Sequence, residues 1–174
     1  VAVVVHEGED GHRTIMSANV GDSRAIMSRK GKAVDLTRDH KPSDEREKQR
    51  ILAMGEEIEW DNFSKVHRVR SLSLSRAIGD RYAKPAVSSE VEIRHCSVAE
   101  EGDNFVLLAS DGLWDVMTSQ EVVDFVQERL DGDFAHEQSQ SRDRDESEDE
   151  DLYLRDNMAK FVAREAIRRG SGDN

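Results

Sequence analysis

The sequence predicts an α+β protein in which antiparallel strands are layered against helices. The chain has 174 residues, enough for one domain or part of one. The predicted order is a group of strands, one helix, a second group of strands and two final helices. Because strands and helices do not alternate one for one, the order argues against a doubly wound parallel sheet and favours an α+β or layered antiparallel arrangement.

Two hairpins are predicted at the start of the chain. The β-branched run Val1–Val5 is typical of a strand buried on both faces. Strand character resumes at Thr14–Val20 after a polar segment with two glycines, which predicts an antiparallel partner for the first strand. Ala25–Met27 and Ala33–Leu36 predict a second hairpin, with its turn at Lys30-Gly31.

The middle of the chain predicts one helix and two further strands. A charged helix is expected to begin near Pro42 and to end at Gly55, where a C-terminal cap belongs. A short strand follows around Ile58 and Trp60. The alternation of apolar residues over Val87–Ile93 predicts a half-buried strand.

The last third predicts a buried central strand and two helices. Phe105–Ala109 is an apolar run of the kind found in the centre of a sheet. Thr118–Glu121 matches a capping box, and the helix it starts is expected to end at Gly132. Residues 133–151 are acidic and poor in apolar side chains, which predicts a solvated, disordered insert. The final helix is predicted by the spacing of Leu154, Met158, Phe161, Val162 and Ile167.

Composition excludes several classes of function. Lys and Arg number 25 against 37 Asp and Glu, so the formal net charge is −12. This balance argues against nucleic-acid binding, which needs a basic face, and against binding to anionic lipid. The longest apolar run, Val1–Val5, is far shorter than the roughly 20 residues that a membrane span requires. One cysteine, Cys96, cannot form an internal disulfide.

Aspartates beside glycines are the first candidates for chemistry. Asp22 and Asp111 each follow an apolar strand pattern, and Asp80 and Asp173 also adjoin glycine. A carboxylate at a strand end beside glycine can be approached closely by a hard cation. Carboxylates without a Cys or His cluster favour Mg²⁺ or Mn²⁺ over Zn²⁺. The alternative is that each dipeptide only forms a turn, and spacing alone does not decide between the two.

Six motifs together resemble the metal-dependent serine/threonine protein phosphatases of the PPM (PP2C) family. They occur in the family's order with compatible gaps, and the resemblance covers nearly the whole chain except the acidic insert. It corresponds to the C-terminal part of the family's catalytic domain. The motifs are Ala18–Arg24, Leu36–Pro42, Arg68–Val69, Leu74–Asp80, Leu108–Val116 and Gly170–Asn174.

The resemblance implies both a fold and a mechanism. The implied fold is a four-layer α-β-β-α sandwich of two antiparallel sheets flanked by helices, of which residues 1–174 would form a partial domain. The implied cofactors are two divalent cations, Mg²⁺ or Mn²⁺, with a third in some members. They activate a water molecule that attacks phosphorus directly, without a phosphoenzyme. Metal binding lowers the pKa of water and neutralises phosphoryl charge, which makes this chemistry reasonable.

The resemblance also implies roles for individual residues. Asp111 and Asp173 match aspartates that ligate one metal of the pair. Asp22 and Asp115 match residues that hold the weaker third metal together with Asp111. The supporting residues are expected to be Arg76, Asp80 and Gly112. We further expect Arg24 to be an ion-pair partner and His40 to be structural.

Several family motifs are missing from this chain. They are an early Glu-Asp pair, the Arg that grips substrate phosphate, and Asp-Gly-His-Gly-Gly, which supplies the bridging aspartate and the general-acid histidine. Asp10-Gly11-His12 resembles the last motif, but Arg13 and Thr14 follow it, and we interpret it as a hairpin tip. No catalytic residue beyond the metal ligands can therefore be identified here. The family's Gly after the Arg-Val motif is also missing near Arg70.

The leading hypothesis is a serine/threonine phosphatase of this family, present as a partial catalytic domain that is inactive alone. The alternative is an inactive pseudophosphatase that acts as a binding or scaffold module. An unrelated β-rich adaptor would require six accidental motif matches. We expect phosphoprotein substrates, no nucleic-acid or membrane partner, a monomer, and a cytoplasmic or nuclear location.

Overall fold

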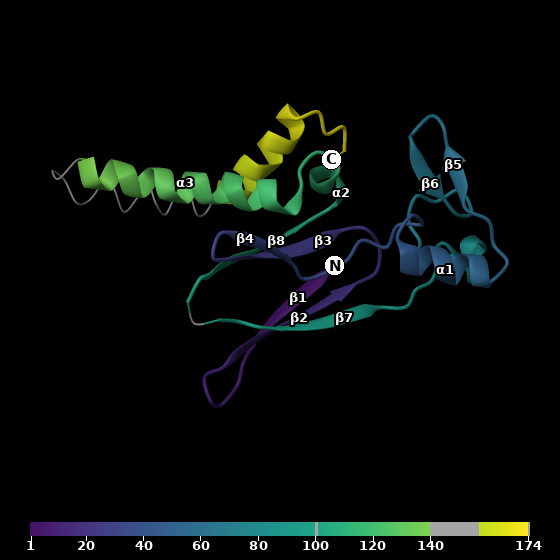
Figure 1. Ribbon diagram of the computed structural model, residues 1–174, viewed down its shortest axis with the longest axis horizontal. Helices are drawn as coiled ribbons and strands as arrows, with labels where there is room; N and C mark the ends of the chain where they lie inside the picture. Colours follow the sequence, from purple (N-terminus) through teal and green to yellow (C-terminus); the bar gives the residue numbers. More distant parts are fainter. Residues whose placement is uncertain (100, 140–156, 174) are drawn as a thin grey trace.

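The computed structural model describes residues 1–99, 101–139 and 157–173 of the chain (Figure 1). The strands are β1 (Ala2–Glu7), β2 (Arg13–Asn19), β3 (Arg24–Arg29), β4 (Lys32–Asp35), β5 (Glu59–Asp61), β6 (Val66–Arg68), β7 (Glu92–Ser97) and β8 (Asp103–Ala109). The helices are α1 (Glu45–Ala53), the short 3₁₀ helix η1 (Arg81–Ala83), α2 (Asp111–Trp114), α3 (Ser119–Ser139) and a C-terminal helix over residues 157–168.

The strands form two three-stranded antiparallel sheets and one small hairpin. The first sheet has the order β1-β2-β7, and Ile15 in its centre pairs with Val5 on one side and Cys96 on the other. The second sheet has the order β4-β3-β8, with Ile26 of β3 opposite Leu107 of β8. The hairpin pairs β5 with β6.

Side-chain alternation along β3 builds two layers of core. Ile26 points to the helices and is buried with Trp114 and Val122. Its neighbours Ala25 and Met27 point to the opposite face, where they are buried with Ile15 of the first sheet. Figure 1 shows the resulting order of layers, with α3 and the C-terminal helix on one side of the second sheet and the first sheet on its other side.

A third cluster forms under α1, at one end of the sheets (Figure 1). Ile51 of α1 is fully buried with Val69 and Val87. α1 begins at an N-cap, Asp44, whose carboxylate accepts hydrogen bonds from the backbone N–H groups of the first turn. The helix thereby anchors the loops on either side of it.

The predicted α+β class with antiparallel sheets is confirmed. The described residues supply a helical layer and two sheet layers. The outer face of the first sheet is open within the described part of the chain, where Val4 is 51% and Ile93 56% exposed. The acidic segment at 140–151 lies outside the described residues. No described helix has the length and apolarity needed to cross a membrane.

Predictions that rest on neighbouring residues, for the hairpins and for one helix cap, are confirmed. Both N-terminal hairpins form, and the Asp10-Gly11-His12 segment is the tip of the first one, where His12 N–H donates to Asp10 Oδ1 over 3.1 Å. The capping box also forms: Glu121 Oε2 accepts from the backbone N–H of Thr118 over 2.8 Å.

Two strands predicted to be buried lie at sheet edges within the described residues. β1 lies at the edge of the first sheet, and its residues Val4 and Val5 are exposed. β8 was expected to be central, but β3 occupies the centre and Leu108 of β8 is exposed. An apolar run shows that a segment favours a strand, whereas its burial depends on which strands pair beside it.

Two predicted boundaries are wrong. α3 does not end at Gly132 but continues to Ser139, because a single glycine costs only about 1 kcal/mol within a helix. The first residues of the predicted acidic insert are therefore helical. The strand predicted over Val87–Ile93 is β7, which begins only at Glu92. Val87 lies before this strand and is buried in the cluster under α1, so the apolar residue that opened the alternating pattern belongs to that core cluster and not to a strand.

Candidate metal centre

Two aspartates meet where the strands of the second sheet end. Asp22 lies in the turn between β2 and β3, and Asp111 begins α2 just after β8. Arg24 pairs with Ala109 across β3 and β8, so the turn and the strand end lie side by side. Burial raises the pKa of the Asp22 carboxyl, and the negative charge of Asp111 raises it further. A cation beside this pair would relieve the repulsion.

Asp115 joins these two aspartates through the geometry of α2. Its backbone N–H donates to the Asp111 carbonyl over 2.8 Å, so the two side chains lie one helical turn apart on the same face. Asp22, Asp111 and Asp115 all line a pocket of about 360 Å³. Lys41 also lines it, with its ammonium nitrogen 3.2 Å from Asp115 Oδ1.

Asp173 approaches the same corner from the C-terminal end of the chain. A Cβ atom on Gly112 would lie only 2.9 Å from Asp173 Oδ2 and 3.0 Å from Asp173 Cβ. Glycine at 112 therefore leaves the space in which the Asp173 side chain sits. Asp173 borders a different pocket, of about 420 Å³, together with Ser110 and Gly112. The four predicted ligands thus surround the start of α2, three of them in one pocket and the fourth beside Gly112.

The remaining lining of the first pocket comes largely from the β5–β6 hairpin. The hairpin residues are Ser64, Lys65, Val66, His67 and Arg68. Arg68 pairs with Asp61 over 2.9 Å, and the His67 ring meets the Trp60 ring edge-on at a centroid distance of 4.9 Å. The pocket therefore combines carboxylates from the β2–β3 turn and from the two ends of α2 with basic side chains from the hairpin.

The carboxylates suit a hard divalent cation. Within residues 1–99, 101–139 and 157–173, no three His, Cys, Asp or Glu side chains form a ready-made metal cage. Mg²⁺ and Mn²⁺ do not require one, since they bind through one or two carboxylates and keep water in other positions. The all-oxygen donors and the raised pKa of Asp22 fit such an ion, and Gly112 leaves room for the Asp173 side chain at the start of α2.

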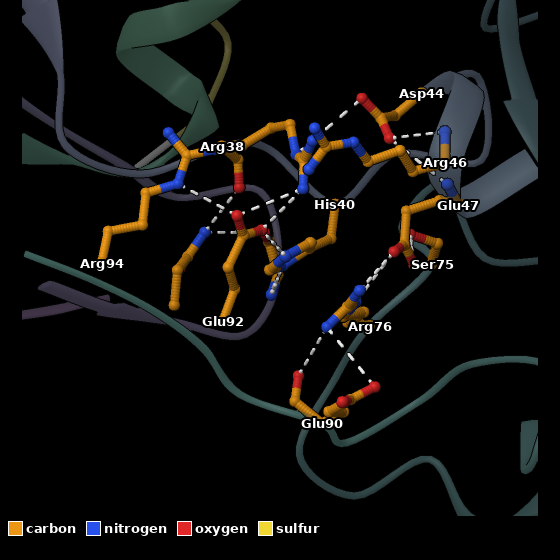
Figure 2. A network of polar contacts seen from close by, with 12 residues as sticks. Arg38, His40, Asp44, Arg46, Glu47, Ser75, Arg76, Glu90, Glu92 and Arg94 are labelled. Atoms are coloured by element: carbon orange, nitrogen blue, oxygen red, sulfur yellow. Dashed lines mark hydrogen bonds and ion pairs between the residues drawn. The ribbon is translucent and has the colours of Figure 1, made fainter. Parts of the chain in front are cut away.

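A buried carboxylate on α1, that of Glu47, holds the segment that contains Ser75 and Arg76 (Figure 2). Glu47 accepts hydrogen bonds from Arg76 Nε over 3.0 Å, Arg50 Nη2 over 2.9 Å and Ser75 Oγ over 2.9 Å. Burial by itself raises the pKa of Glu47, but these donors outweigh it and hold the pKa at about 2. Arg76 also donates to the Glu90 carbonyl over 3.1 Å, so it ties α1 to the segment before β7.

A second carboxylate, Glu92 of β7, holds the loop that contains His40. Figure 2 shows it between Arg38, Arg94 and His40. Arg38 Nη2 lies 3.1 Å from both carboxylate oxygens, Arg94 Nε lies 3.0 Å from one, and His40 Nε2 lies 3.0 Å from the other. Burial opposes ionisation of Glu92, yet these three contacts lower its pKa to about 2.

Two other predicted residues have clear surroundings. Arg24 makes a two-point ion pair with Asp39, at 2.9 and 2.7 Å, and its guanidinium lies 5.0 Å from the centre of the Trp114 ring. Asp80 is exposed, adopts a left-handed backbone conformation before η1 and makes no capping hydrogen bond with its side chain. It is not among the residues that line the pocket of Asp111.

The whole chain matches one family model. The model is described as protein phosphatase 2C and covers residues 1–174. The chain belongs to the protein phosphatase 2C family. Two similar plant relatives are "Probable protein phosphatase 2C 59" of Oryza sativa subsp. japonica, 38% identical over 92% of this chain and 41% of the relative, and "Protein phosphatase 2C 3" of Arabidopsis thaliana, 51% identical over 61% of this chain and 23% of the relative.

Solved structures of similar proteins share the fold. A C. elegans sex-determining protein has a TM-score of 0.73 at 29% identity, over 92% of this chain and 35% of the other. A serine-threonine phosphatase 2C from Toxoplasma gondii has a TM-score of 0.59 at 25% identity, over 86% of this chain and 52% of the other. The chain spans about two fifths of the length of the rice relative, since the match covers 41% of that relative.

Sequence reasoning assigned no role of their own to three charged residues of this phosphatase 2C chain, of which Lys41 lines the pocket. No role was predicted for Glu47 or Glu92, although the structure makes them the acceptors of the two polar networks. For Glu47 the available signal was its position one turn before Ile51, on the buried face of α1. Lys41 was seen only as part of a motif. No pattern in the sequence identified Glu92 as half-buried and multiply bonded.

Proposed function

We propose that this chain is part of a metal-dependent protein serine/threonine phosphatase that hydrolyses phosphoserine and phosphothreonine. The observation that carries the proposal is the gathering of Asp22, Asp111 and Asp115 in one pocket, in a chain of the protein phosphatase 2C family. Asp173 packs against Gly112 beside the same helix start. Since the chain spans about two fifths of a relative's length, the activity is proposed for the complete protein.

The described carboxylates would hold Mg²⁺ or Mn²⁺. We assign Asp111 and Asp173 to one metal of a pair, and Asp22 and Asp115, with Asp111, to a weaker third metal. Divalent metals in such a site supply Lewis-acid activation of water and neutralise phosphoryl charge. The protein's part is to hold these carboxylates close together around the start of α2.

The chain's other side chains would position ligand and substrate. Lys41 holds Asp115 through its 3.2 Å contact. Lys65 and His67 extend from the hairpin into the lining of the same pocket. A phosphorylated side chain that enters the pocket would meet these basic groups, which favour its dianionic phosphate.

The isolated 174-residue chain should be a poor catalyst. Asp-Gly-His-Gly-Gly, which the family uses for further metal ligands and the general acid, does not occur in it, and its early Glu-Asp dipeptide, Glu9-Asp10, lies in the turn of the first hairpin. If the complete protein has altered versions of these motifs, the pseudophosphatase alternative applies and the protein acts as a binding or scaffold module.

The test is Mn²⁺-dependent phosphate release from a phosphothreonine peptide by the complete protein. We expect activity that a chelator abolishes, and we expect Asp111→Ala to lose most of it. His12→Ala is the matched control, because His12 lies at an exposed hairpin tip and should leave the rate unchanged. Near wild-type turnover by Asp111→Ala, or no Mn²⁺-dependent activity in the wild type, would refute the proposal.

A further inference from the structure

His40 clamps the backbone next to a predicted metal ligand from two directions. The Gly21 N–H donates to His40 Nδ1 over 3.2 Å, and the His40 N–H donates to the Gly21 carbonyl over 3.0 Å. Both backbone polar groups of Gly21 are therefore bonded to one residue. Gly21 directly precedes Asp22, so its orientation decides where the Asp22 carboxylate points.

The conformation of Gly21 needs such a clamp. Its φ of +115° is open to glycine and rarely adopted by other residues, and glycine is also the residue with the most conformational freedom to lose. Asn19 adds a third restraint, since its Nδ2 donates to the Gly21 carbonyl over 3.1 Å and to the Arg38 carbonyl over 3.0 Å. Without these contacts the turn that carries Asp22 could occupy several conformations.

The hydrogen bonds of His40 also fix its tautomer. Because Nδ1 accepts from the Gly21 N–H, it carries a lone pair, and the ring proton belongs on Nε2. Nε2 then donates to Glu92 over 3.0 Å. Glu92 is itself held by Arg38 and Arg94, as Figure 2 shows. The imidazole is fully buried, so solvent does not compete for either nitrogen.

The backbone of His40 is held from the opposite side. Its carbonyl accepts from the Ser75 N–H over 2.7 Å, and the Ser75 hydroxyl donates to Glu47. The histidine thus lies between two carboxylate networks. Together they fix the position of its ring, and the ring in turn fixes the position of the acceptor for one backbone N–H. A purely apolar side chain of similar size could fill this space but could not accept the Gly21 proton.

We propose that His40 is a positioning residue that orients the Gly21–Asp22 turn toward Asp111 through its unprotonated Nδ1. This rests on the proposed function, because it assumes that Asp22 contributes to a metal site. His40 is not among the residues that line the pocket of Asp22, Asp111 and Asp115. The effect of its side chain on metal binding should therefore be transmitted through the Gly21 N–H.

Two substitutions separate the functions of the ring nitrogens. In His40→Asn, the side-chain oxygen can take the place of Nδ1 and accept from Gly21, while the contact with Glu92 is lost. In His40→Gln, the longer amide can donate to Glu92 but leaves the Gly21 N–H without its acceptor. Both variants remove the ring, so both should lower the melting temperature by similar amounts. Only the loss of the Gly21 acceptor should affect metal binding.

The experiment is Mn²⁺ titration of the complete protein, with binding measured by calorimetry and by the electron paramagnetic resonance signal of free Mn²⁺. We expect His40→Gln to weaken the Asp22-dependent Mn²⁺ binding about 10-fold, because the loss of one hydrogen bond changes an affinity by about this factor. His40→Asn should weaken it less than about 3-fold. Asp22→Asn identifies the Asp22-dependent class. The Asp22→Asn/His40→Gln double variant should bind no more weakly than Asp22→Asn alone.

Failure of each idea gives a different result. If both His40 variants bind Mn²⁺ as the wild type does while the wild type is an active phosphatase, the positioning role is wrong and the proposed function stands. Equal weakening in the two variants also overturns it, because that result indicates general loosening. If the wild type binds no Mn²⁺, the proposed function falls and the role of His40 falls with it.

Discussion

Replacing Glu47 by glutamine should destabilise the protein by about 3 kcal/mol. The Glu47 side chain is 2% exposed and accepts from two arginines and a serine. Glutamine keeps the shape but offers only one acceptor oxygen, and its NH₂ group would face an arginine. Breaking a buried ion pair by removing one partner costs roughly 3–5 kcal/mol. The lower end applies here, because Arg50 and Arg76 keep some exposure to water.

The pKa of Glu47 gives a second route to the magnitude. The folded protein lowers this pKa from 4.5 to about 2. At neutral pH that difference corresponds to about 3 kcal/mol of stability, in agreement with the first value. A lowered folded-state pKa contributes stability that is present above pH 4.5 and is lost as pH falls toward 2. The cost of Glu47→Gln should therefore be about 1 kcal/mol smaller at about pH 4 than at pH 7.

Urea unfolding of the complete protein at the two pH values measures both quantities. Glu45→Gln is the matched control, since Glu45 lies in the same first turn of α1 but is exposed. It should change the free energy of unfolding by less than about 0.5 kcal/mol. If Glu47→Gln costs no more than Glu45→Gln, or if its cost does not depend on pH, the charge-paired network does not stabilise the fold as argued.

Three further substitutions test separate features. Gly112→Ala should weaken Mn²⁺ binding by the complete protein about 10-fold or more, because the added Cβ would displace Asp173. Gly172→Ala is the control, since a Cβ there meets open space and should leave Mn²⁺ binding unchanged. Calorimetry measures the Mn²⁺ affinity of both variants. Thr118→Ala should lower the free energy of unfolding by about 1 kcal/mol in urea titration, since it removes the N-cap of α3. Ser71→Gly should raise the melting temperature, with a gain of about 0.5–1 kcal/mol, because Ser71 has a φ of +70°.

The last of these follows from a departure that the sequence had already indicated. The family's glycine is missing near Arg70, and the structure closes the turn with Arg70 and Ser71 both at positive φ. Val69 and Leu72 still bridge across this turn. The chain thus keeps the turn and accepts local strain, which is why glycine should be favourable there.

Features encoded in neighbouring residues could be predicted from the sequence, and those that depend on pairing could not. The hairpins and the capping box need only short-range information, and both are present. The exposure of β1 depends on its place at the edge of a sheet, which its own run of valines does not reveal. The candidate aspartates were found through motifs, but Glu47 was missed because charge in a helix normally indicates a solvated face.

The dependence of this site on buried carboxylates has a physical reason. Asp22 lies in a turn between two strands, and Asp111 begins the short helix α2. Apolar packing is non-directional and would tolerate small rotations of such a turn, whereas hydrogen bonds constrain both distance and angle. The contact with Glu92 fixes the orientation of the His40 ring, and the ring fixes the orientation of the Gly21 N–H. A site that must hold like-charged carboxylates close together needs this directional support, since their mutual repulsion would otherwise rotate the turn outward.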